Sequence, residues 1–78
     1  MKKTYRIELD DLDLGQAVDG LEARAKQWED TAQYLRTGES PDEFFMPEEC
    51  REAEEAKNIA SHYRSIIAKI RKQQDEQT

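Results

Sequence analysis

The fold is decided by residues 14–35, which read LGQAVDGLEARAKQWEDTAQYL. Apolar or small residues recur in this stretch with alternating steps of four and three: Leu14, Val18, Leu21, Ala25, Trp28, Ala32 and Leu35. This spacing is typical of an amphipathic helix with one narrow apolar seam of the coiled-coil kind. We therefore expect a first helix over residues 14–37, with Asp13 as its N-terminal cap and Gly38 as the left-handed residue that ends it.

A second apolar seam predicts a second long helix over residues 47–73. Pro47 suits its first position, and one face carries Ala53, Ala56, Ala60, Tyr63, Ile67 and Ile70. An antiparallel arrangement matches both seams in one register, in which Trp28, for example, lies opposite Ala56. The same register brings together two pairs of opposite charges on one flank: Glu22 with Arg64, and Glu29 with Lys57. The sequence thus predicts an antiparallel helical hairpin.

Three shorter segments complete the single small domain expected over residues 1–78. Residues 4–10 alternate polar and apolar side chains, which predicts a β-strand with one apolar side formed by Tyr5, Ile7 and Leu9. A serine, a proline and two acidic residues from Ser40 onward predict a short helical turn over residues 41–46. Residues 74–78 are polar and are expected to form a frayed tail.

The predicted hairpin leaves part of its surface uncovered. Ile59 and Ile66 lie about 60–80° from the seam around the second helix, so two helices alone leave them exposed. A single strand also lacks a partner for its backbone hydrogen bonds. If the strands of two protomers pair above a layer formed by the helices of both, the strand gains a hydrogen-bonding partner and the two isoleucines are covered. The expected fold is therefore mainly α, a β-α-α chain completed as a homodimer or higher oligomer through Tyr5, Ile7, Leu9, Ile59 and Ile66.

Length and composition exclude several classes of protein. The 78 residues are 38% charged and 36% hydrophobic, with a formal net charge of -6. No apolar run approaches the ~20 residues of a membrane span, and the N-terminus lacks the apolar core of a signal peptide, so we expect a cytoplasmic protein. One Cys and one His exclude a disulfide framework and a multi-Cys or multi-His metal site. We expect no cofactor, no metal and no direct binding to nucleic acid, which the acidic charge repels.

The strongest candidate for a partner-binding surface is the hairpin tip, where Phe44, Phe45 and Met46 form a run of large apolar residues. One phenylalanine is expected to fold back onto the open end of the hairpin near Leu35. The other, with Met46, forms an apolar hot spot. Its expected acidic rim consists of Asp42, Glu43, Glu48 and Glu49. This composition predicts docking on a basic protein surface that has an apolar notch.

These features predict a protein that is not an enzyme, because the chain has no Gly-rich phosphate loop and no third group beside His62 and Ser65. We expect an interaction module that binds an unidentified larger protein. In size, charge and lack of catalytic groups, rather than in any motif, the chain looks like phage and mobile-element accessory proteins that block host nucleic-acid-handling or defence enzymes. The alternative is an oligomer that sequesters a small anion such as a nucleotide between protomers, at Arg64 and Arg71. A third hypothesis is a subunit or antidote that folds fully only with its cognate partner.

Overall fold

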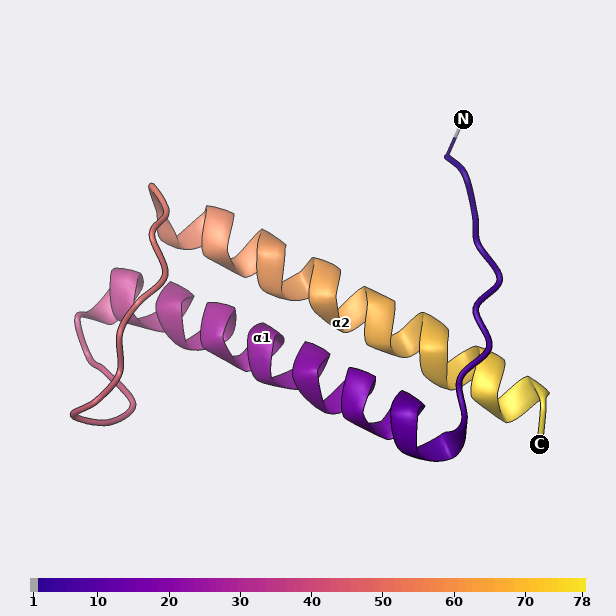
Figure 1. Ribbon diagram of the computed structural model, residues 1–78. Coiled ribbons are helices and arrows are strands. Elements are labelled where there is room, and N and C mark those ends of the chain that lie inside the picture. The colour runs from indigo at the N-terminus through magenta and orange to yellow at the C-terminus, as the bar shows by residue number, and fades with distance from the viewer. Residues whose placement is uncertain (1) are drawn as a thin grey trace.

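Two long antiparallel helices form the body of the protein in a computed structural model, which describes residues 2–78 (Figure 1). Helix α1 spans Asp11–Thr37 and helix α2 spans Ala53–Glu76. Residues 38–52, which we call the connector, join the two helices at one end of the hairpin. The predicted antiparallel hairpin is confirmed, because α1 and α2 pack against each other along their length.

Helix α1 starts three residues earlier than predicted and ends as predicted. Asp10, rather than Asp13, is the N-cap, and its Oδ1 accepts a 2.8 Å hydrogen bond from the Asp13 N–H. Asp11 and Asp13 lie in the first turn, where their negative charges interact favourably with the positive end of the helix dipole. At the other end Gly38 adopts the left-handed conformation, with φ of 79°, and donates a 2.7 Å hydrogen bond to the Tyr34 carbonyl. A glycine suits this position because a side chain is strained there.

Helix α2 starts six residues later than predicted, at Ala53 instead of Pro47. The N-cap Glu52 makes no side-chain capping bond, but the Glu55 carboxylate accepts a 3.0 Å hydrogen bond from the Arg51 N–H and so satisfies a backbone donor just before the helix. At the C-terminus α2 continues to Glu76, so most of the predicted frayed tail is helical.

The buried core is made of seam residues from both helices, as the spacing predicts. It comprises Val18, Ala25 and Ala32 of α1 with Ala56, Ala60 and Ile67 of α2. The prevalence of alanine lets the two backbones approach closely. A seventh buried residue, Thr31, lies off the predicted seam, and its environment is described below.

Ion pairs on the flank of the hairpin show that its register differs from the predicted one. Glu29 pairs with Arg64, not Lys57, through hydrogen bonds of 3.0 and 2.8 Å. Glu22 pairs with Arg71 at 3.0 Å, not with Arg64. Each partner is displaced by seven positions, so the two helices are offset by one heptad from the prediction. A heptad repeat permits this displacement because it returns apolar residues to the seam.

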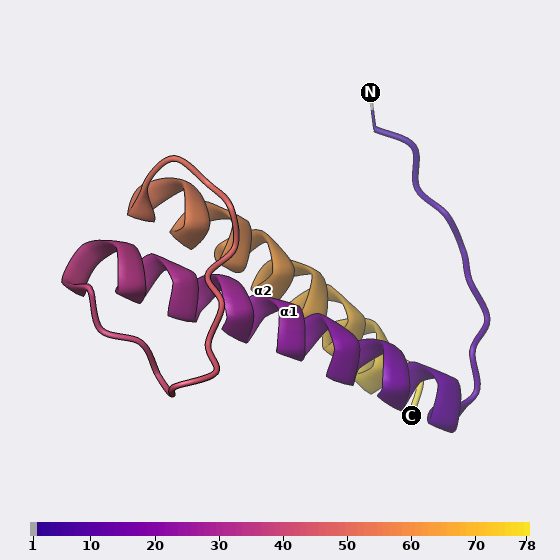
Figure 2. The ribbon, with the colours of Figure 1, turned by 60° about the vertical axis from the view of Figure 1, so that its left-hand side comes forward.

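The predicted strand over residues 4–10 is wrong for this chain, since the structure contains no strand within residues 2–78. The segment runs away from the start of α1, and Figure 2 shows it clear of both helices. Tyr5 is 79% exposed and Ile7 is 73% exposed, while Leu9 is also exposed. A strand requires a neighbour for its backbone N–H and C=O groups, and a single copy of the chain supplies none.

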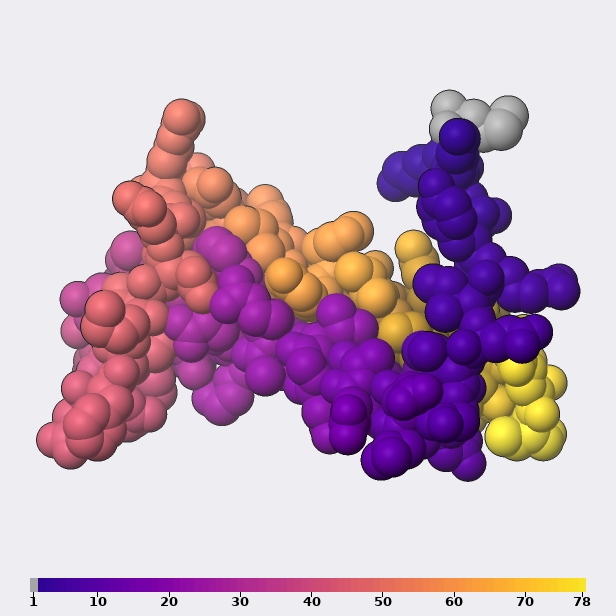
Figure 3. Space-filling view, in the orientation of Figure 1, coloured from indigo at the N-terminus to yellow at the C-terminus, as the bar shows by residue number. Residues whose placement is uncertain are grey.

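The outer face of α2 is open between the N-terminal segment and the connector, which both rise above it in Figure 3. Ile59 and Ile66 on α2 are half-buried rather than fully exposed. Gly20 lies within α1 and has nothing within 4 Å of an added Cβ, so no neighbouring group requires a glycine there. Neither α1 nor α2 combines the length and the apolar character that crossing a membrane requires.

Candidate partner-binding surface

The connector crosses the side of α1 before it reaches α2, as Figure 2 shows. Three polar contacts hold it there. The Gln27 side-chain amide donates a 2.6 Å hydrogen bond to the Met46 carbonyl. The Glu48 N–H donates to the Thr31 hydroxyl at 3.1 Å, and the Glu48 carboxylate pairs with the Arg24 guanidinium at 2.7 Å. Residues far apart in sequence thus fix the second half of the connector to α1.

Thr31 is the central residue of this attachment. Its side chain is fully buried at 0% exposure. The Thr31 hydroxyl donates to the Gln27 carbonyl at 2.8 Å and accepts from the Glu48 N–H, so it links the helix to the connector. Sequence analysis missed this residue because Thr31 does not lie on the seam, and no pattern in the sequence indicates that a loop covers it.

The first half of the connector contains one tight turn instead of the helical turn predicted over residues 41–46. The Asp42 carboxylate accepts a 2.9 Å hydrogen bond from the Phe44 N–H, and the Asp42 carbonyl accepts one of 3.3 Å from the Phe45 N–H. An aspartate that bonds the backbone two residues ahead stabilises a turn in place of a helix. Phe44 and Phe45 are the last two residues of this turn.

The two phenylalanines have different environments. Phe45 is half-buried, and its ring centroid lies 6.0 Å from that of Tyr34 with a tilt of 58° between the rings. This packing agrees with the expectation that one phenylalanine folds back onto the end of the hairpin. Phe44 is 83% exposed and Met46 is 77% exposed. We call this exposed pair the connector tip.

The acidic rim expected around these residues is present in part. Asp42, Glu43 and Glu49 are exposed. Glu48 is half-buried and is engaged with Arg24, so its charge is partly neutralised within the chain. The surface around the connector tip therefore presents two large apolar side chains with acidic neighbours along the same segment.

The residues of the anion-binding alternative are engaged in ion pairs. The Arg64 guanidinium contacts both carboxylate oxygens of Glu29, and Arg71 contacts Glu22. The hydrogen bonds from Arg64 lower the pKa of Glu29, so this partner stays charged at neutral pH. An anion at Arg64 or Arg71 has to compete with these carboxylates. A shallow depression beside Arg64 is also bordered by Arg36 and Lys57, but Glu29 lines it too.

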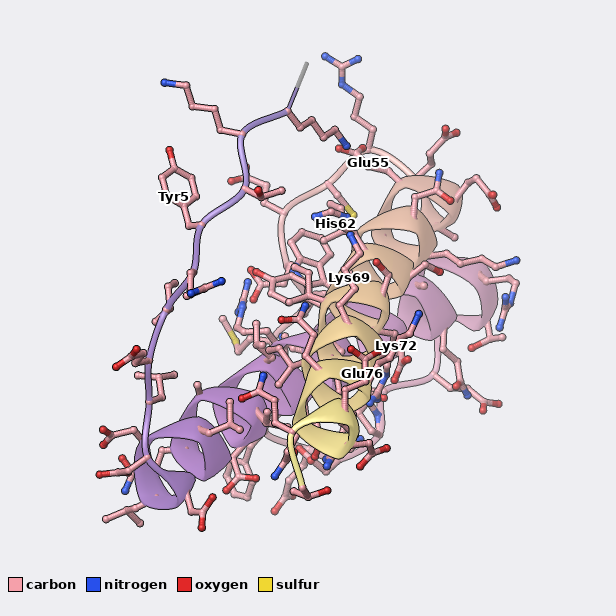
Figure 4. The ribbon with its side chains drawn as sticks, turned by 90° about the vertical axis from the view of Figure 1, so that its right-hand side faces the viewer. Tyr5, Glu55, His62, Lys69, Lys72 and Glu76 are labelled. Atoms are coloured by element: carbon pink, nitrogen blue, oxygen red, sulfur yellow. The ribbon has the colours of Figure 1, made fainter. Side chains whose placement is uncertain are left out.

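Two further groups could carry chemistry, the thiol of Cys50 and the imidazole of His62. The Cys50 thiol is half-buried, and desolvation followed by the charge of Glu55 raises its pKa, so it is protonated at neutral pH and a weak nucleophile. His62 is exposed on α2, and Figure 4 shows it on one side of the helix between Glu55 and Lys69. Within residues 2–78, no group of three or more His, Cys, Asp or Glu side chains is placed to hold a metal ion.

Comparison of the chain with protein-family models, with curated proteins and with solved structures finds no match.

Proposed function

We propose that the protein is a non-enzymatic interaction module whose connector tip, Phe44 and Met46, docks into an apolar notch on a basic surface of a larger protein. One observation carries this proposal: long-range polar contacts hold in place a connector that exposes two large apolar side chains. A segment that is already fixed loses less conformational freedom when it binds. Exposed aromatic and methionine side chains are also the residues from which interface hot spots are built.

Charge supports a basic partner. The chain carries a formal net charge of -6, and the connector adds the exposed carboxylates of Asp42, Glu43 and Glu49 near the tip. Opposite charge on the partner accelerates the encounter and orients it, whereas an acidic surface is repelled. A groove that binds nucleic acid is a surface of this kind, because it must be basic to neutralise phosphates. Occupying such a groove inhibits the enzyme that contains it, as expected of a phage or mobile-element inhibitor.

The test is a quantitative affinity capture from cells that carry the protein, using the wild type and the double variant Phe44→Ser/Met46→Ser. A true partner is retained by the wild type and lost with the variant. The partner is then purified, and its direct binding is measured at low and high salt. Affinity should fall as salt rises, because the acidic residues near the tip contribute attraction that salt screens.

Leu12→Ser is the matched control, because Leu12 is also a large exposed apolar residue but lies at the opposite end of the hairpin, in the first turn of α1. It should bind like the wild type. The far-UV circular dichroism spectra of the wild type and the two variants should coincide, since all the substituted side chains are exposed. Equal capture by the wild type and the double variant contradicts the proposal, and so does loss of the same partner with Leu12→Ser.

A further inference from the structure

The N-terminal segment is the least explained part of the molecule. Residues 2–9 belong to no helix or strand, and they display three large apolar side chains to solvent. In Figure 4 the labelled Tyr5 stands on this segment apart from α2, whose row Glu55, His62, Lys69 and Glu76 runs along the helix. The backbone at its end is extended, with φ of -77° and ψ of 175° at Asp10. Figure 2 shows the rest of the segment as an extended trace that stands away from the helices, so its backbone can pair with another chain.

We infer that this segment pairs with the same segment of a second copy of the chain, as an antiparallel two-stranded ribbon centred on Ile7. The inference goes beyond the proposed function and uses a different surface from the connector tip. Its basis is that the sequence from Thr4 to Asp10 is complementary to itself when one copy is reversed.

Charge complementarity fixes the direction and the register of the pair. With Ile7 opposite Ile7 of the second copy, Arg6 lies opposite Glu8 twice, once on each side of the two-fold axis. Directly opposite pairs of unlike charge stabilise a ribbon, and like charges destabilise it. Sliding the strands by two residues one way places Arg6 opposite Arg6. Sliding them the other way places Glu8 opposite Glu8 and Arg6 opposite Asp10, so each slipped register contains a like pair that the register centred on Ile7 avoids. Parallel in-register pairing brings like charges together as well, so a single arrangement is favoured.

The same arrangement gathers the apolar side chains on one face. Tyr5 lies opposite Leu9 of the second copy, so the three apolar residues of each strand form one surface of six side chains. A two-stranded ribbon is marginal in water unless this face is covered. Helix α2, on which Ile59 and Ile66 are half-buried, is available as the covering layer.

The experiment measures solution mass by light scattering for the full chain from micromolar to near-millimolar concentration. The wild type should approach twice its monomer mass of 9.1 kDa as concentration rises. Arg6→Glu and Glu8→Arg should each stay monomeric, because both charge pairs then become repulsive. An equimolar mixture of these two variants should associate again, and so should the double variant Arg6→Glu/Glu8→Arg by itself. The single variants distinguish antiparallel from parallel pairing. In a parallel in-register ribbon each position faces itself, so Arg6→Glu replaces one like pair by another and leaves association unchanged, whereas in the antiparallel ribbon it turns two unlike pairs into like pairs.

Each outcome decides the inference. A wild type that stays at 9.1 kDa at every concentration overturns it. Association that persists in Arg6→Glu overturns it too, because another surface is then responsible. Helix content should be the same in all variants, since residues 2–9 lie outside the helices. Phe44→Ser/Met46→Ser should associate like the wild type, so failure of the ribbon and failure of the partner-binding proposal are separate results.

Discussion

Replacing Thr31 by valine tests whether the connector is fixed to α1 as described. Valine keeps the shape of threonine, and the two residues have nearly the same helix propensity. The substitution removes the hydroxyl that accepts the Glu48 N–H and donates to the Gln27 carbonyl. The Gln27 carbonyl keeps its ordinary helical partner. The Glu48 N–H loses its acceptor at a part-buried position, so the loss of this bond dominates the expected effect.

The magnitude follows from leaving one donor without a partner. A buried unsatisfied donor costs about 1–3 kcal/mol, and because this site is only part-buried we expect about 1–2 kcal/mol. In a domain of this size, each kcal/mol lowers Tm by roughly 4–8 °C. The Thr31→Val variant should therefore melt about 4–16 °C below the wild type. Amide exchange at Glu48 should also accelerate, because the connector opens more readily when its attachment is weakened.

Thr37→Val is a closely matched control. The Thr37 hydroxyl likewise donates to the carbonyl four residues earlier, that of Gln33 at 2.9 Å, and accepts a connector amide, that of Glu39 at 3.2 Å. These groups are exposed and close in sequence, so water replaces the lost hydroxyl and the free energy of unfolding should change by less than about 0.5 kcal/mol. Equal effects at Thr31 and Thr37, or an unchanged exchange rate at Glu48, would refute the role assigned to Thr31.

Three further perturbations test the end of α1, the register and the acid dependence of the fold. Gly38→Ala forces a side chain into the left-handed conformation and should destabilise the fold by about 1–2 kcal/mol. Gly20→Ala, in the middle of α1, should stabilise it by about 0.5–1 kcal/mol. Denaturant titration measures both changes, and changes of the same sign would contradict the roles given to these two glycines. Glu29→Arg should lower the stability of the fold by up to about 1 kcal/mol. Adding Arg64→Glu should restore that stability, and adding Lys57→Glu should not. Rescue by Lys57→Glu alone would indicate the register predicted from sequence. Hydrogen bonds from Arg64 lower the pKa of Glu29, so this carboxylate stabilises the fold above its unfolded pKa and loses that contribution as the pH falls through the lowered value. The Glu29→Gln variant should therefore lose less stability than the wild type on acidification below about pH 5. Parallel curves of unfolding free energy against pH for the two proteins would count against the pair.

Local patterns in the sequence predict the features that depend on neighbouring residues. The seam from Leu14 to Leu35 identifies α1, and Gly38 marks its end, because capping and helix periodicity act over a few residues. The folding back of one phenylalanine also follows from local composition. At the start of α1 the prediction of Asp13 as the cap is wrong, because Asp10 caps the helix and Asp13 lies in its first turn.

Features that depend on distant partners are not visible in the sequence. The segment over residues 4–10 has the alternation of a strand, but a strand also requires a neighbour, which one copy does not provide. Thr31 is buried because the connector crosses it, and no periodicity reports that crossing. Glu48, expected as a first-turn residue of the second helix, instead pairs with Arg24.

The displaced register and the exposed connector tip have a common origin. Both registers satisfy the seam, and both bring Glu22 and Glu29 opposite basic residues, so the flanking charges do not choose between them. In the prediction residues 47–52 are the first residues of the second helix. In the structure these six residues belong to no helix, Met46 and Glu48 bond to their partners on α1, and Phe44 is exposed beside the turn at Asp42. The polar contacts of the connector with α1 add to the stability of the observed register, and the same contacts hold the segment that carries the proposed docking surface.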